Sequence, residues 1–85
     1  MLDVKEAARK ASDYFAGLYP VESRSNVQLE EVELTEDGKY WFITLSYPVP
    51  PELSALNFNF KRKYKVFKID AGTGQVVSMK IRKVE

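Results

Sequence analysis

Five consecutive residues near the C-terminus, Asp70-Ala71-Gly72-Thr73-Gly74, have the composition of a loop that could hold a phosphate group or a metal ion. A phosphate-binding loop needs converging backbone N–H groups followed by a helix N-terminus, but alternating β-type residues follow Gly74. A calcium loop needs several oxygen ligands, and Asp70 is the only carboxylate in residues 53–84. The segment is therefore predicted to be a hairpin turn, in which Asp70 accepts backbone hydrogen bonds and the glycines can adopt a positive φ.

The densest basic run in the chain is Lys61-Arg62-Lys63-Tyr64-Lys65. On a strand, Lys61, Lys63 and Lys65 lie on one face, and a row of lysines beside aromatic rings can bind nucleic acid or another polyanion. A pI near 7.9 is below the range typical of nucleic-acid-binding domains, and lysines on a solvated or edge strand also prevent aggregation. These three lysines are candidate anion-binding residues, and nucleic-acid binding is the alternative function.

The acidic counterpart of this run lies earlier in the chain. Its carboxylates are Glu30, Glu31, Glu33, Glu36 and Asp37. Paired carboxylates can perform acid/base catalysis when their environments differ, but these residues precede a turn and have no second cluster to face. We interpret them as a solvated face, with cross-strand pairing to lysines as the alternative.

Other catalytic chemistry has few carriers in this chain. The sequence contains no cysteine and no histidine, so it lacks thiolate nucleophiles, disulfides, the commonest general base and the commonest transition-metal ligand. Its serines have no histidine to activate them, and no local signature supports a serine–lysine arrangement. We predict no catalytic residue, no cofactor and no metal site, and therefore no enzyme.

Charge is distributed unevenly along the 85 residues, although the net charge is only +1. Residues 1–40 carry nine acids and five bases, whereas residues 41–85 carry three acids and eight bases. If both halves enter one sheet, one of its edges is acidic and the other basic. Ordinary solvated strand faces account for the same distribution.

Periodicity predicts one helix followed by four strands in a single domain over residues 1–85. The helix covers residues 3–18, with Asp3 as its N-cap and an apolar stripe that includes Phe15 and Leu18. The strands are expected at 27–34, 40–49, 57–70 and 75–84. The fold class is α+β: one N-terminal helix packed on a curled four-stranded antiparallel sheet.

Changes in the alternation predict two interruptions of the strands. One is a β-bulge near Glu30-Glu31, and the other is a bulge or bend near Val66-Phe67. In the last strand, Val77, Met79 and Ile81 are expected to point inward, with Val76 pointing outward. The predicted turn at residues 36–39 contains Asp-Gly, a common hairpin signal.

The loop over residues 50–57 begins with two prolines and contains apolar residues. Leu53, Leu56 and the following Phe58 either fold back onto the domain or form a patch that meets a partner. They are the candidate partner-binding residues.

The segment "YKVFKIDAGTGQVVSM" resembles the end of a PepSY domain, a type named after peptidase propeptides and a sporulation-associated protein. Asp70, Thr73, Gly74 and Val76 or Val77 match its closing pattern, and the preceding "EAARKASDYF", "VQLEEVEL" and "KYWFITLSY" match its order of elements. A similar turn occurs in β-propeller blades, which lack the helix. The loop over residues 48–57 and the basic strand depart from the pattern. The resemblance implies a cystatin-like fold and a non-catalytic interaction domain, often linked to peptidase inhibition.

The leading functional prediction is therefore a non-enzymatic protein-interaction module that is inhibitory toward a peptidase. Its partner is expected to be another protein or a flanking domain, with a homodimer through an edge strand as a further possibility. No apolar run approaches the length that spans a membrane, and the N-terminus lacks the apolar segment of a signal peptide. A cytoplasmic location is the default expectation.

Overall fold

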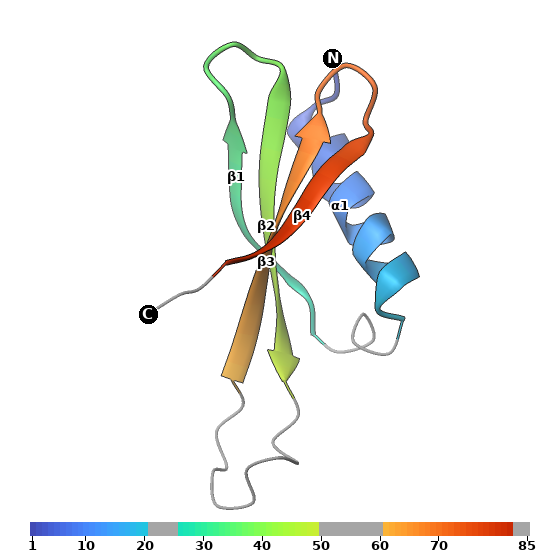
Figure 1. The fold of residues 1–85 in the computed structure, drawn as a ribbon, viewed down its shortest axis with the longest axis vertical. Helices are drawn as coiled ribbons and strands as arrows, with labels where there is room; N and C mark the ends of the chain where they lie inside the picture. The colour runs from blue at the N-terminus through green and yellow to red at the C-terminus, as the bar shows by residue number, and fades with distance from the viewer. Residues whose placement is uncertain (21–25, 50–60, 83–85) are drawn as a thin grey trace, which may run out of the picture.

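The computed structural model describes residues 1–20, 26–49 and 61–82 and shows one helix against a four-stranded antiparallel sheet (Figure 1). The elements are helix α1 (Val4–Leu18) and strands β1 (Gln28–Leu34), β2 (Tyr40–Val49), β3 (Lys61–Asp70) and β4 (Val76–Arg82). The strand order is β1-β2-β3-β4, with β1 and β4 at the edges. The predicted α+β fold class is confirmed.

Helix α1 begins and docks as its sequence predicts. The Asp3 carboxylate accepts a hydrogen bond from the backbone N–H of Glu6 at 2.8 Å, which satisfies one of the free donors of the first turn. Ala7, Ala11 and Phe15 are buried against the sheet, and the two alanines allow close approach. The prediction for Leu18 is wrong: this last residue of the helix is 51% exposed.

The hydrophobic core lies between the helix and the two central strands. Ile43 on β2 is paired in register with Phe67 on β3, and both are fully buried. The Phe15 ring packs between the rings of Tyr19 and Tyr47, with centroid separations of 5.1 and 5.0 Å. The other buried residues of this core cluster are Ala7, Ala11, Leu45 and Ile69.

The strand interruptions agree with the sequence at one position and differ at the other. The register of β1 and β2 shifts between Leu29 and Glu31, which confirms the first bulge. The β2–β3 ladder is regular through Val66 and Phe67, so no bulge occurs at the second predicted position. Instead, Lys68 pairs with Ser78 and Ile69 with Val76, which leaves Val77 as the extra residue on β4. Val66 and Phe67 differ in face because both faces of β3 carry apolar side chains.

Strand β4 is covered less than the sequence suggests. Val76 packs against the core, whereas Val77 and Ile81 are 51% and 73% exposed. The bulge at Val77 reverses the alternation on one side of it. Ile81 is exposed because the helix lies over the centre of the sheet and leaves this edge strand partly uncovered.

The N-terminal residues connect the helix to the far ends of the strands. The backbone N–H of Leu2 donates to the carbonyl of Ala71 at 2.7 Å, and the indole N–H of Trp41 donates to the carbonyl of Leu2 at 3.0 Å. These bonds fix the start of the helix beside the β3–β4 turn, where Figure 1 shows the N-terminus. Among the described residues, no helix has the length and apolarity needed to cross a membrane.

Candidate functional site

The Gly-rich segment after β3 is a hairpin turn built around the carboxylate of Asp70. One oxygen of this carboxylate accepts hydrogen bonds from the backbone N–H groups of Gly72 and Thr73, at 2.8 and 2.9 Å. The N–H of Gly74 donates to the Asp70 carbonyl at 2.8 Å, and Gly74 has a φ of +79°. The N–H groups that a phosphate would need are therefore engaged within the turn.

Two turn carboxylates have altered acidity, and both are explained by local hydrogen bonds. Donation from the backbone of Thr73 and then of Gly72 lowers the pKa of Asp70 below its ordinary value. Donation from the Thr35 hydroxyl, followed by the backbone N–H of Lys39, lowers the pKa of Asp37. Both groups therefore stay ionised near neutral pH and serve as hydrogen-bond acceptors in turns.

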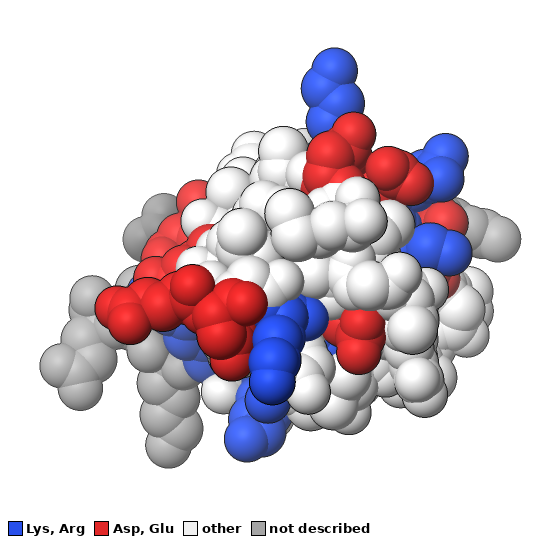
Figure 2. All heavy atoms as spheres, turned by 90° about the horizontal axis from the view of Figure 1, so that it is seen from above, with Lys and Arg blue, Asp and Glu red and all other residues white. Residues whose placement is uncertain are grey.

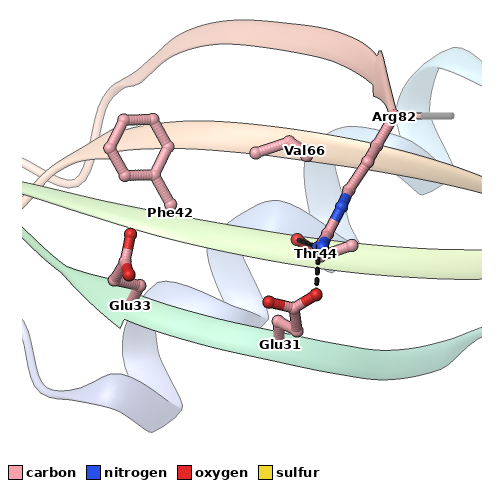
Figure 3. Close-up of a pocket in the computed structure, with 6 residues that line it drawn as sticks. All are labelled: Glu31, Glu33, Phe42, Thr44, Val66 and Arg82. Atoms are coloured by element: carbon pink, nitrogen blue, oxygen red, sulfur yellow. Dashed lines mark hydrogen bonds and ion pairs between the residues drawn. The ribbon is translucent and has the colours of Figure 1, made fainter. Parts of the chain in front are cut away.

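The described residues form a hollow on the sheet face opposite the helix. Its volume is about 330 Å³, and all four strands contribute to its lining (Figure 3). The lining residues are Glu31, Glu33, Phe42, Thr44, Val66 and Arg82. We call this surface the open face. Phe42, Val66 and the Thr44 side chain form its floor. Strand β1 contributes the acidic residues of its lining, and β4 contributes the basic residue Arg82.

Arg82 crosses the open face from one edge of the sheet toward the other. Its guanidinium forms an ion pair with Glu31 of β1 and donates a long hydrogen bond of 3.5 Å to the Thr44 hydroxyl. Figure 3 shows the Arg82 side chain extending past Val66 to reach both groups. Since both charged side chains of the pair remain substantially exposed, a pair of this kind contributes only about 0–1 kcal/mol, and a ligand can displace it at low cost.

A second polar network lies on the open face beside this hollow. The Ser46 hydroxyl is fully buried; it donates to a Glu30 carboxylate oxygen at 2.6 Å and accepts from the Arg62 Nε at 3.0 Å. Arg62 also donates to the carbonyl oxygens of Asn26 and Ser46, at 2.7 and 3.1 Å. This network holds the guanidinium of Arg62 in place and connects β3 to β2 and the start of β1.

Charge is segregated across the open face. The register places Glu31 and Glu33 of the edge strand β1 beside Thr44 and Phe42 of β2. On the other side, Lys68 of β3 and the β4 residues Lys80 and Arg82 supply positive charge. Seen from the end of the molecule in Figure 2, acidic side chains gather on the side where β1 lies, with basic groups close beside them. The acidic edge and the basic edge expected from the sequence are therefore β1 and β4.

Among the candidate anion-binding lysines, the structure places Lys63 and Lys65 in different environments. Their strand, β3, is a central strand of the sheet. Lys65 is only 8% exposed, and its ammonium lies 5.1 Å from the centroid of the Tyr19 ring, on the helix side. Lys63 is exposed, and Lys61 pairs with Val49 at the start of β3. The candidate partner-binding residues Leu53, Leu56 and Phe58 lie outside the described residues.

The cluster on the open face was not predicted from the sequence, although part of its signal is there. Phe42 and Thr44 alternate with the core residues of β2, which marks a second, half-covered face. What connects them to Glu31 and Arg82 is the strand order and the register. If each strand is assumed to pair with the next strand in the sequence, Glu31, Phe42, Thr44 and Arg82 fall on one face of the sheet.

The described residues contain no cluster of three or more acidic side chains that could hold a metal ion. The chain was also compared with models of protein families, with curated proteins and with solved structures, and none of these comparisons found a match.

Proposed function

We propose that this chain is a non-enzymatic protein-interaction module that takes a segment of a partner protein on its open face. The observation that carries this proposal is the hollow with an apolar floor, which the exposed ion pair between Glu31 and Arg82 crosses. Phe42 and Val66 can contact an apolar side chain of the partner, while Glu31 and Arg82 can exchange their mutual ion pair for charges on the partner.

The chemistry of the open face specifies the order of groups that a partner segment should present. A basic group fits beside Glu31 and Glu33, an apolar group fits over Phe42 and Val66, and an acidic group fits beside Arg82. Central aromatic contacts supply most of the affinity in protein interfaces, while charges at the rim set orientation and specificity. A peptide with only one sign of charge should therefore bind less well than one with both.

Selection of peptides from a random displayed library on the immobilised domain tests this proposal. We expect enriched peptides with an apolar residue between opposite charges, and we expect Phe42→Ala and Arg82→Glu each to weaken their binding at least about tenfold, or 1.4 kcal/mol. Arg9→Glu is the matched control, because Arg9 is an exposed arginine on the helix. Peptides that bind the Phe42→Ala variant as well as the original domain would place the interaction elsewhere.

The resemblance to PepSY domains supports peptidases as the class of partner. The proposed inhibitory action is tested by adding the domain to peptidases of several mechanistic classes and measuring cleavage of an unrelated substrate. An inhibitor slows that cleavage, remains uncut itself and loses its effect in the Phe42→Ala variant. If selected peptides bind but no peptidase is inhibited, the result supports the proposed interaction module and contradicts the inhibitory role.

Nucleic acid is a weaker candidate than protein as the partner of this chain. The ammonium of Lys65 lies against Tyr19, and Arg62 is held by Ser46 and Asn26, so fewer cations of the basic strand are available to phosphates. Fluorescence anisotropy with single-stranded DNA and RNA at two salt concentrations tests this ranking. Submicromolar binding that is steeply weakened by salt, and lost when Lys61, Lys63 and Lys65 are all replaced by Gln, would reverse it.

A further inference from the structure

Among residues 1–20, 26–49 and 61–82, strand β4 forms one edge of the sheet and pairs with β3 alone. The backbone groups on its outer side are therefore available to another strand, and such edges readily pair with a second chain. Its apolar residues Val77 and Ile81 are 51% and 73% exposed. An available edge and uncovered apolar side chains thus occur on the same strand.

We propose that two copies of this chain form a symmetric dimer by antiparallel pairing of their β4 strands, with Met79 at the two-fold axis. The result is a continuous eight-stranded sheet with both helices on the same side. This inference goes beyond the proposed function, because it uses the edge of the sheet rather than its open face. The occupant of the β4 edge is a second copy of the same chain.

The side chains of β4 are self-complementary in this register. Val77 lies opposite Ile81 of the second copy, so the two exposed β-branched residues cover each other, and this happens twice in the dimer. Ser78 lies opposite Lys80 of the second copy, and no two like charges are directly opposed. Cross-strand pairs between apolar β-branched residues are favourable, whereas directly opposed like charges are unfavourable.

The neighbouring symmetric registers fit less well. A two-fold axis at Lys80 would place the two Lys80 side chains opposite each other. An axis at Ser78 would leave Ile81 beyond the paired segment. Only the axis at Met79 aligns all seven residues of β4, including the bulge residue Val77, with β4 of the second copy.

Apolar side chains on the helix border the same edge. The Tyr14 ring packs edge-on against Phe67 at a centroid distance of 6.2 Å, and Phe67 is the register partner of Met79 on β4. Leu18 follows one helical turn after Tyr14, and both side chains are more than two-fifths exposed. The second copy therefore meets an apolar border above β4 as well as a free backbone edge.

The other edge strand, β1, is poorly suited to pairing. Its charged side chains Glu30, Glu31 and Glu33 would repel each other in a self-paired dimer. Pairing of β1 with β4 of the next copy would match opposite charges, but it would generate an open-ended assembly rather than a closed dimer.

Cysteine cross-linking tests the register directly, since the chain has no cysteine of its own. In the Met79→Cys variant the two new thiols face each other at the two-fold axis, within reach of a disulfide. In the matched Ile81→Cys variant each thiol faces Val77, and the two thiols lie far apart. We expect mild oxidation to cross-link the first variant into a dimer and leave the second largely monomeric. More cross-linking of the highly exposed Ile81→Cys variant would indicate random collision and overturn the proposal.

Sedimentation equilibrium measures the dimer without cross-linking. Ile81→Lys should weaken dimerisation by about tenfold or more, because it removes an apolar contact at two symmetric places and adds positive charge. Val32→Lys, the same kind of change on β1, should leave it unchanged. Added salt should strengthen the dimer, because Lys80 and Arg82 from both copies lie near its seam. A monomer at all concentrations, assemblies larger than a dimer, or weakening by salt would each overturn the proposal.

Discussion

The two faces of the sheet bury residues by different means. On the helix side, Phe15, Ile43 and Phe67 are buried by apolar packing, and alanines on the helix allow close approach. On the open face, Thr44 and Ser46 are equally inaccessible, but they lie beneath charged side chains that include Arg62 and Arg82. The difference indicates that apolar packing holds the first face together, whereas hydrogen bonds and an ion pair hold the second.

The largest effect should come from the helix side. Phe15→Ala should lower the free energy of unfolding by about 3–5 kcal/mol, because it leaves a cavity between Tyr19 and Tyr47. That is a large share of the roughly 5–15 kcal/mol typical of a whole domain. Denaturant titration followed by the fluorescence of Trp41, the single tryptophan, measures it. Leu18→Ala, which alters an exposed apolar residue of the same helix, should cost well under half as much. Equal costs would contradict the assignment of the core to this face.

The second prediction concerns the turn that holds the helix to the sheet. Gly74→Val should destabilise the domain by about 1–3 kcal/mol through its positive φ, and the added Cβ would also lie 3.1 Å from a Leu2 methyl carbon. Gly38→Val is the matched control, because Gly38 has a φ of +71° but no atom near the added Cβ. Thermal denaturation should show the larger loss for Gly74→Val. A larger loss at Gly38 would mean that the contact with Leu2 contributes nothing.

The third prediction tests whether burial on the open face depends on hydrogen bonds. Ser46→Ala should cost about 1–2 kcal/mol, because Glu30 and Arg62 lose their shared hydroxyl partner. Thr44→Val keeps the volume and removes only the long bond from Arg82, so its effect should stay within about 0.5 kcal/mol. Urea titrations of both variants provide the comparison. A Thr44→Val cost as large as that of Ser46→Ala would show that shape rather than polarity governs this face.

The smallest expected effect is a loss of thermal stability at acidic pH. The folded pKa of Asp70 lies below its ordinary value of 3.8, as does that of Asp37, so their stabilising contribution is present above that pH and is lost as pH falls through the folded values. Melting temperatures measured from neutral pH downward should therefore fall below about pH 4. Asp70→Asn should flatten this dependence as well as lower stability at neutral pH. An unchanged pH profile in the variant would assign the acid sensitivity to other carboxylates.

The sequence supports the fold more fully than the site, for physical reasons. Alternation along β2, the Asp3 cap and the Asp70 turn are local patterns, and each is confirmed by the structure. The exposure of Leu18 and Ile81 depends on how far the helix extends over the sheet, which no local pattern reports. The meeting of Glu31 with Arg82 depends on register across four strands, so it becomes visible only when the sheet is assembled.

The tie between the N-terminus and the β3–β4 turn has a consequence for how the chain assembles. Consecutive strands pair with their neighbours in sequence, and such local contacts form early because they close short loops. The helix precedes all four strands in the chain, but the backbone of Leu2 forms hydrogen bonds with Trp41 and Ala71, which come later. The helix should therefore dock after the strands have paired, and its apolar stripe stays uncovered until most of these four strands have been synthesised.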